Sequence, residues 1–192
     1  MTARRQWVAV GVAAAIVAAG AVAAHVLLGR EFALVTVGSH APNFRAQTLD
    51  TPPHTKSLAD YSGRVVMLNI WATWCAPCRE EMPSLEVLQR AYGPRGLAIV
   101  AVSVDDSDAT AVVRGFVRQY GLTFDILHDA SGSVRDIYQT TGVPETFVIA
   151  RDGTIRKKAA LAENWASPGN QSLIEQLLNE GRSDRVAEGR GE

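Results

Sequence analysis

Two nearly unbroken apolar runs dominate the hydrophobic pattern of this chain. Residues 65–70 and 97–104 are apolar at almost every position, without the alternation of a half-exposed strand. Runs of this length are typical of strands that other elements cover on both faces. The pattern therefore predicts two central strands of a single sheet.

Beyond these runs, apolar residues recur at the three- and four-residue spacing of a helix. Met82, Leu85 and Leu88 share one such face, and Pro83 is expected to kink the helix that carries them. The polar residues 105–108 are expected to cap the next helix. The predicted helices cover residues 79–92, 109–120, 131–138 and 170–180.

Shorter segments complete the predicted sheet. The Asp152-Gly153 pair is typical of a two-residue loop that joins two antiparallel strands. Strands that alternate with helices, closed by a hairpin and a helix, predict an α/β fold with a mixed central sheet and helices on both faces. The additional predicted strands cover residues 44–49, 55–58, 124–127, 147–150 and 155–160.

The N-terminal segment has a different pattern. Residues 7–28 carry no charge and one clearly polar side chain, His25, and Arg4 and Arg5 precede them. At about 1.5 Å per residue, a helix of this length spans a bilayer core of about 30 Å. Because basic residues stay on the cytoplasmic side, we expect residues 1–30 to form a single-pass signal anchor (a transmembrane helix) in the cell membrane, with the rest of the chain outside the cytoplasm.

A cleavable signal peptide is the alternative, since Ala21-Val22-Ala23 fits a cleavage site of small residues. The apolar run continues past that site to Leu28, which favours the uncleaved anchor. Cleavage would leave a secreted or periplasmic protein, so either interpretation predicts an exported domain. We expect that domain to cover residues 36–181 and residues 182–192 to form a flexible tail, because the tail is polar and rich in glycine.

The charge balance argues against a nucleic-acid partner. The 192 residues carry a net charge of −1, with 19 basic and 20 acidic side chains. The sequence has no basic stripe and no array of aromatic and arginine residues of the kind that binds nucleic acid. The candidate chemistry must therefore come from another feature of the chain.

That feature is a cysteine pair. The two cysteines of the chain, Cys75 and Cys78, directly follow the first apolar run and precede a predicted helix. A strand that leads into a helix at this point puts the first thiol at the positive end of the helix dipole, which favours the thiolate. The pair is therefore expected to exchange electrons with other disulfides, without a further cofactor, in a compartment where disulfides are made.

Two other roles for the cysteines are weaker. A structural disulfide across so short a loop would remove little entropy from the unfolded chain. A structural zinc site needs four ligands, and the four histidines are scattered, with no second cysteine pair. No metal site is predicted.

The chemistry of such a pair assigns roles to the residues around it. Cys75 is expected to be the exposed nucleophile, and Cys78, one turn further into the helix, is expected to be the more buried thiol that resolves the mixed disulfide. Pro77 lacks an N–H donor and stiffens the loop, and Trp74 is expected to cover one side of the site. Trp74, Ala76 and Pro77 are therefore predicted to contact the substrate.

Residues 71–83, 142–147 and 38–44 resemble the membrane-tethered TlpA/ResA/DsbE family of extracytoplasmic thiol-disulfide reductases, which have a thioredoxin fold. The resemblance covers residues 36–180. Residues 109–127 are similar to the extra helix and strand that this family inserts into the minimal thioredoxin fold. The resemblance implies a thioredoxin-like domain that exchanges disulfides with partner proteins.

The same resemblance implies a cis peptide before Pro144, facing the cysteines, and a position for Glu81 beneath the dithiol. On a helix, residues 78 and 81 share a face. A buried carboxylate there disfavours the thiolate and is able to hold or pass a proton during exchange. Glu80, by contrast, is expected to be a solvated helix residue.

The segment around Pro144 is expected to contact the substrate. Val143 presents backbone groups that are suited to pair with an extended strand of a partner. Glu145 is expected to steer substrate choice by its charge. A glutamate at this position resembles the cytochrome c maturation branch of the family.

Together these observations predict a reductase of partner disulfides. The favoured substrate is the Cys-x-x-Cys of an apocytochrome c, and a membrane thiol-disulfide carrier is the expected electron donor. A broader reductase for other exported or metal-delivery proteins is the alternative, and a copper-binding chaperone that uses the dithiolate is the non-enzymatic one. A peroxiredoxin shares the opening Ala41-Pro42-x-Phe44, but its signature has a threonine where this chain has Ala72.

Overall fold

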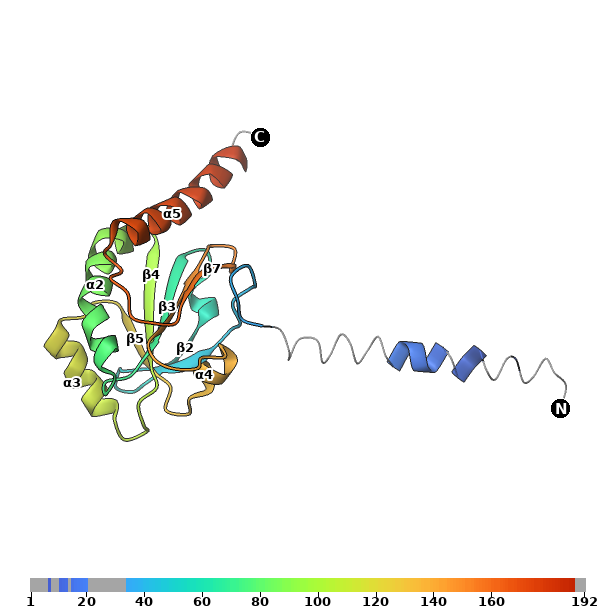
Figure 1. Cartoon of the computed structure of the whole chain (residues 1–192), viewed down its shortest axis with the longest axis horizontal. Coiled ribbons are helices and arrows are strands. Elements are labelled where there is room, and N and C mark those ends of the chain that lie inside the picture. The colour runs from blue at the N-terminus through green and yellow to red at the C-terminus, as the bar shows by residue number, and fades with distance from the viewer. Residues whose placement is uncertain (1–6, 8–10, 14, 21–33, 189–192) are drawn as a thin grey trace. The chain divides into compact units, whose positions relative to one another are not determined.

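The computed structural model describes residues 7, 11–13, 15–20 and 34–188 (Figure 1). The chain divides into two units, Met1–Leu34 and Val35–Glu192. Much of the predicted membrane segment, including residues 21–28, lies outside the described residues. Within the part that is described, no helix is both long enough and apolar enough to cross a membrane.

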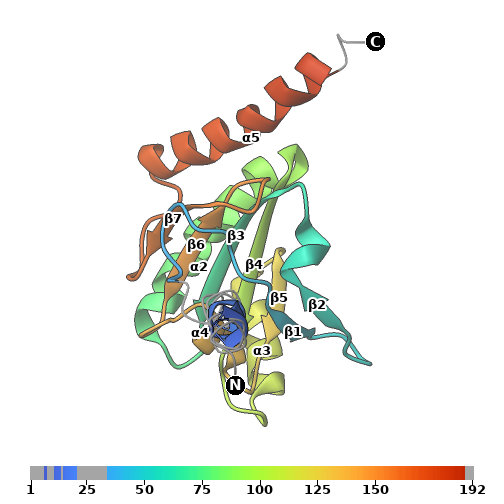
Figure 2. The same ribbon diagram turned by 90° about the vertical axis from the view of Figure 1, so that its right-hand side faces the viewer.

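A mixed sheet forms the centre of the second unit, as the sequence predicts. In chain order, its strands are β1 (Arg45–Thr48), β2 (Thr55–Ser57), β3 (Val65–Trp71), β4 (Leu97–Ser103), β5 (Asp125–His128), β6 (Glu145–Ile149) and β7 (Ile155–Ala159). Across the described residues they lie side by side in the order β2-β1-β5-β4-β3-β6-β7 (Figures 1 and 2). β3, β4 and β5 are parallel, and the outer strands pair antiparallel.

The two long apolar runs form the central parallel pair, which confirms the prediction. Every residue of β3 and β4 is buried, and Val65 aligns with Leu97 at the start of their ladder. Neighbouring residues such as Met67 and Leu68 belong to different hydrophobic clusters, one on each face of the sheet. Because both faces of the sheet are covered, the side chains on both sides of these strands are apolar, and the sequence does not alternate between apolar and polar residues.

Helices cover both faces of the sheet (Figure 1). On one face, side chains of α2 (Ala76–Tyr92), α3 (Thr110–Tyr120) and α5 (Pro168–Glu188) enter the larger cluster. On the other, α4 (Ser133–Ile137) and the 3-10 turn η1 (Leu58–Tyr61) contribute to the smaller one. α3 and β5 are the helix and strand that the family resemblance implies between β4 and α4.

α2 begins earlier than its apolar pattern predicts. Its first residue is Ala76, because Cys75 serves as the N-cap and Pro77 fits the first turn, where its missing N–H is not needed. Pro83 lies inside the helix without ending it, and a second 3-10 turn, η2 (Gly93–Arg95), follows. The cysteine pair therefore belongs to the first turn of the helix.

The start of α3 differs from the prediction. Its N-cap is Ala109, and no side chain caps it. Among the polar residues expected to do so, Asp105 turns into the interior, where it accepts hydrogen bonds from Thr73 and Ser103. The local sequence favours a cap, but the distant Thr73 and the neighbouring Ser103 offer this carboxylate more donors.

α5 extends beyond its expected end at residue 180. The helix continues to Glu188, through much of the predicted tail of residues 182–192. The polar residues after position 180 lack the apolar spacing from which a helix is predicted, but polar residues do not by themselves end a helix. Gly181 destabilises a helix by only about 1 kcal/mol relative to alanine. Residues 189–192 lie outside the described part of the chain.

Candidate active site

The cysteine pair lies where β3 leads into α2, at the carboxyl end of a central strand. Cys75 and Cys78 form a disulfide, with their Cα atoms 5.3 Å apart. Cys78 is fully buried and Cys75 is 5 % exposed. The order of accessibility agrees with the prediction, but Cys75 is far less exposed than expected, because the loop that carries Val143 lies against its sulfur.

The start of α2 surrounds Cys75 with positive potential. Its Sγ accepts a hydrogen bond from the backbone N–H of Cys78 at 3.2 Å. This donor and the dipole of the helix favour negative charge on Cys75 once the disulfide is reduced. Trp74, Ala76 and Pro77 are exposed around it, Trp74 by 65 %, so they form a rim that a partner is able to reach.

The loop that faces the disulfide contains a cis peptide bond between Val143 and Pro144, as the family resemblance implies. The carbonyl oxygen of Val143 lies 3.5 Å from Sγ of Cys75. Pro144 is buried and Val143 is half-buried. A backbone acceptor therefore lies beside the sulfur that a partner must approach, which is the arrangement that strand pairing with a substrate requires.

Glu145 does not have the surroundings that its predicted role requires. Its side chain is 2 % exposed and forms an ion pair with Nζ of Lys158 at 3.1 Å. Lys158 also donates a hydrogen bond to the carbonyl oxygen of Val35. Since the carboxylate is buried and paired, it does not present a free charge to a partner. It instead ties the segment after Pro144 to β7 and to the first residues of the domain.

Glu81 is buried, with 2 % exposure, and both of its carboxylate oxygens accept hydrogen bonds. Asn69 donates to Oε1 through Nδ2 at 2.7 Å, and the indole N–H of Trp165 donates to Oε2 at 3.2 Å. The N–H of Glu163 lies at 3.4 Å from the same Oε2. Burial raises the pKa of Glu81 and outweighs these hydrogen bonds, which act in the opposite direction.

Asn69 connects the buried carboxylate to the strand that follows the cis-proline. Its Nδ2 donates to Oγ1 of Thr146 at 2.9 Å as well as to Glu81. Our sequence analysis does not single out Asn69 or Trp165. A signal for Asn69 is present, since it is the one polar residue within β3, whereas Trp165 lies in a segment without a motif.

A second polar network supports the loop that leads to Trp74. Asp105 accepts hydrogen bonds from the N–H and the hydroxyl of Thr73, at 2.9 and 2.6 Å. The carbonyl oxygen of Asp105 lies 2.9 Å from Nε2 of His128, and Nδ1 of His128 lies 3.0 Å from Oγ1 of Thr110. Because a carbonyl oxygen only accepts, Nε2 of His128 carries the proton.

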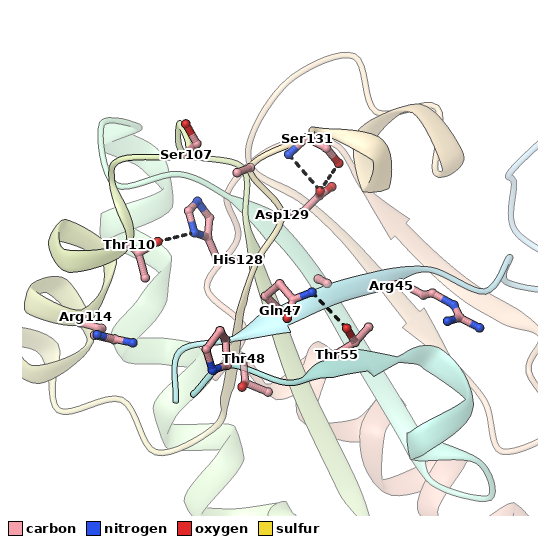
Figure 3. Close-up of a pocket in the computed structure, with 13 residues that line it drawn as sticks. Arg45, Gln47, Thr48, Thr55, Ser107, Thr110, Arg114, His128, Asp129 and Ser131 are labelled. Carbon is pink, nitrogen blue, oxygen red and sulfur yellow. Dashed lines mark hydrogen bonds between the residues drawn. The ribbon is translucent and has the colours of Figure 1, made fainter. Parts of the chain in front are cut away.

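A hollow of about 560 Å³ lies beside this network, along β1 and β5, and Figure 3 draws the side chains that line it. Most of its polar side chains hydrogen-bond one another, and these bonds tie the surrounding loops together. The hydrogen-bonded pairs drawn there are Thr110 with His128, Gln47 with Thr55, and Asp129 with Ser131.

The reactive groups near the start of α2 are thus a disulfide and a buried carboxylate. Among the side chains that the structure describes, no three His, Cys, Asp or Glu residues are grouped so as to hold a metal ion. A cysteine pair on the first turn of a helix, against a cis-proline loop and within a mixed sheet, defines a thioredoxin-like thiol-disulfide oxidoreductase.

The chain belongs to the AhpC/TSA family. The model of that family matches residues 37–158, which is more than half of the chain and includes both cysteines and the cis-proline loop. The family membership and the geometry of the site agree on the thioredoxin-like class.

Curated relatives match the same part of the chain. The thiol-disulfide oxidoreductase ResA of Oceanobacillus iheyensis is 41 % identical over 123 residues, which is 63 % of this chain and 63 % of that protein. ResA of Geobacillus thermodenitrificans is 39 % identical over 123 residues, 64 % of this chain and 68 % of that protein. The thioredoxin-like protein YneN of Bacillus subtilis is 42 % identical over 120 residues, 62 % of this chain and 68 % of that protein.

Solved structures share the fold. A Chlorobium tepidum protein, described as a candidate thiol:disulfide interchange protein DsbE, superposes with a TM-score of 0.64 and 29 % identity, over 78 % of this chain and 99 % of that one. A secreted disulfide oxidoreductase of Mycobacterium tuberculosis, described as homologous to E. coli DsbE, superposes with a TM-score of 0.56 and 25 % identity, over 70 % of this chain and 93 % of that one.

Proposed function

We propose that this protein reduces the disulfides of exported proteins outside the cytoplasm, and that apocytochrome c before haem attachment is its favoured substrate. The observation that carries the proposal is the arrangement of Cys75 between the cis-proline loop and the first turn of α2, with Glu81 buried one turn further on. The similarity to ResA and DsbE proteins supports thiol-disulfide exchange as the reaction.

The exchange transfers two electrons to the partner. In the reduced protein, the thiolate of Cys75 attacks one sulfur of the partner disulfide, forms a mixed disulfide and releases the other sulfur as a thiolate, which takes up a proton. The sulfur of Cys78 then attacks Sγ of Cys75. The Cys75–Cys78 disulfide forms again, and the second sulfur of the partner leaves as a thiolate and is protonated.

Glu81 is suited to accept the proton that Cys78 must lose in the second step. Cys78 is fully buried, so its thiol has no direct contact with bulk water. A carboxylate three residues further along the helix is on the same face. Burial raises the pKa of Glu81 toward the working pH, which makes the carboxylate a better base for this transfer.

After each cycle the protein is oxidised and needs two electrons. We propose that a membrane thiol-disulfide carrier supplies them and that residues 1–30 anchor the domain in the cell membrane, on the periplasmic side. The uncharged run of residues 7–28 and the preceding Arg4 and Arg5 support this orientation. A secreted or periplasmic protein after signal cleavage is the alternative.

The reduction potential of the cysteine pair tests the direction of the reaction. Equilibration of the full chain with glutathione buffers is expected to give a value well below about −120 mV, which is the potential of a strong oxidant of this class. A potential near that figure would make the protein an oxidant and contradict the proposal. Cys75→Ser provides the background, because it leaves no disulfide to equilibrate.

Oxidised peptides test the choice of substrate. The reduced protein is expected to reduce an apocytochrome c peptide with Cys-x-x-Cys-His about tenfold faster than a Cys-x-x-Cys peptide of a metal-delivery protein. Equal rates would favour the broader reductase. Peroxide consumption at catalytic protein concentrations would support a peroxiredoxin, and stoichiometric copper in protein purified without reductant would support a copper chaperone.

A further inference from the structure

We propose that a groove between Trp74 and α3 binds the polypeptide segment beside the disulfide of the substrate. This inference rests on the proposed reduction of protein disulfides and identifies the surface that receives the partner. The groove has a volume of about 640 Å³, and five of the residues that line it belong to α3, which is labelled in Figure 1. The residues that define this Trp74 groove are Trp74, Arg79, Val112, Gly115, Phe116 and Tyr120.

The Trp74 groove is lined by residues on both sides of the cysteine pair in the chain, Trp74 and Arg79. Trp74 directly precedes Cys75, on which the mixed disulfide holds the sulfur of the partner. An extended chain advances roughly 3.3–3.6 Å per residue. The two or three residues that flank the partner's cysteine are therefore within reach of the groove while the mixed disulfide exists.

The walls of the groove combine exposed apolar side chains with the polar side chains of Thr73 and Gln119, which also line it. Trp74 is 65 % exposed and Val112 is 58 % exposed. The rings of Phe116 and Tyr120 stack with their centroids 4.2 Å apart, and Phe116 packs on Trp71 of β3 at 4.8 Å. Phe116 is itself buried and holds Tyr120 in place, so the exposed side chains of Trp74 and Val112 supply the surface that is suited to an apolar side chain of the partner.

The charge of the groove indicates what else the partner carries. Arg79 is the charged residue among those that line it. Its guanidinium is exposed and donates a hydrogen bond through Nη1 to the carbonyl oxygen of Thr73, at 3.3 Å. A guanidinium has five N–H donors, so Arg79 retains donors for an acceptor of the partner. The occupant is therefore an extended segment with an apolar residue and a carboxylate close to its cysteine.

Gly115 is an independent observation that points to an occupant. It lies in the interior of α3, where glycine is less favourable than alanine. No atom of a neighbouring element lies within 4 Å of the Cβ that alanine would add, and the helical backbone there does not have a positive φ. Neither packing nor backbone conformation requires glycine, but its missing side chain leaves open space in the lining of the groove.

A substitution that fills the groove tests the proposal. The probes are a small neutral disulfide, hydroxyethyl disulfide, and an oxidised Cys-x-x-Cys peptide with leucine and glutamate within three residues of its first cysteine. In the reduced full chain, Gly115→Leu is expected to slow reduction of the peptide about tenfold and to change the rate with hydroxyethyl disulfide less than about twofold. Gly115→Ala, which favours the helix and adds only a methyl group, is expected to have an intermediate effect.

One further variant is a control, and another tests the charge of the groove. Ala91→Leu adds bulk at an exposed position at the other end of α2 and is expected to leave both rates unchanged. Arg79→Gln is expected to reduce, by about fivefold, the preference for the glutamate peptide over the same peptide with lysine.

The outcomes separate this proposal from the proposed function. If Gly115→Leu leaves the peptide rate unchanged, or slows both probes alike, the groove does not bind the substrate. Reduction of both probes by the unsubstituted protein would then still support a disulfide reductase. If the unsubstituted protein reduces neither probe, the proposed function itself is wrong.

Discussion

Glu80 and Glu81 are neighbours in sequence with opposite surroundings. Glu80 is exposed, whereas Glu81 is buried and accepts hydrogen bonds from Asn69 and Trp165. Helix spacing places residues 78 and 81 on one face, and the family resemblance implies that Glu81 is the one that lies under the dithiol. The donors are not predictable in this way, because they come from β3 and from the segment before α5.

Replacement of Glu81 is expected to change how stability depends on pH. The pKa of Glu81 is higher in the folded protein than the ordinary value of 4.5. Between these two values the folded state holds more protons than the unfolded state, so the free energy of unfolding falls as the pH rises through that window. Glu81→Gln lacks this contribution, and urea unfolding of the oxidised protein from acidic to neutral pH measures the difference.

Glu80→Gln is the matched control, since its carboxylate is exposed, and its stability is expected to follow the unsubstituted protein at every pH. The same pair of variants is informative for the reduced thiols. Glu81→Gln is expected to shift their titration and Glu80→Gln is not. If Glu81→Gln and the unsubstituted protein gave the same curves in both measurements, Glu81 would have no part in the mechanism.

At the scale of elements, β6 connects the cis-proline loop to the rest of the sheet. Glu145 at its start pairs with Lys158 of β7, and Thr146 accepts a hydrogen bond from Asn69 of β3. The two neighbouring strands therefore hold the strand immediately after Pro144. This explains why a glutamate beside the active site is buried and does not face a partner.

The ion pair between Glu145 and Lys158 is expected to stabilise this arrangement. Lys158→Met leaves a buried carboxylate without its partner, which is expected to cost about 3 kcal/mol in the free energy of unfolding. The double variant Glu145→Gln, Lys158→Met removes both charges and is expected to recover most of that loss. Denaturant unfolding of the three proteins measures both effects, and an unaltered stability of Lys158→Met would show that the pair contributes nothing.

The elements themselves were largely predictable, and so were the ends of α2 at Tyr92 and of α3 at Tyr120, but the start of α2 and the end of α5 were not. The unbroken apolar runs identified β3 and β4, and the helical spacing of Leu85 and Leu88 identified α2, because these patterns reflect burial directly. The predicted side-chain cap of α3 was wrong, since Asp105 accepts hydrogen bonds from Thr73 and Ser103 and does not cap the helix. A side chain caps a helix only when no other hydrogen-bond donors, here those of Thr73 and Ser103, take its oxygen atoms.

At the scale of the whole molecule, the domain has a sharp beginning. Leu34 is exposed, whereas Val35 is buried and its N–H donates to Oε1 of Gln139 at 3.2 Å. Both hydrophobic clusters are formed by residues from Val35 onward. The chemistry of exchange therefore belongs to a unit with its own core, which is the usual basis for independent folding.

Residues 35–192 alone are expected to fold and to reduce an oxidised Cys-x-x-Cys peptide at a rate within about twofold of the full chain, with dithiothreitol as the electron source. With membrane vesicles as the electron source, only the full chain is expected to turn over repeatedly, because the proposed carrier lies in the membrane. Slow exchange by the isolated domain with dithiothreitol would contradict its independence. Equal turnover with vesicles would contradict the role of the anchor.

The sequence by itself determined the class of protein: two cysteines at a junction of strand and helix, a mixed α/β sheet and a carboxylate on the helix face of Cys78. These features depend on spacing between near neighbours, which a single sequence displays completely. Only the tertiary structure decided that Val143 covers the sulfur of Cys75, that Glu145 is paired with Lys158 and that Gly115 leaves a groove open. Each of these depends on contacts between residues far apart in the chain, and no local pattern records the distances between them.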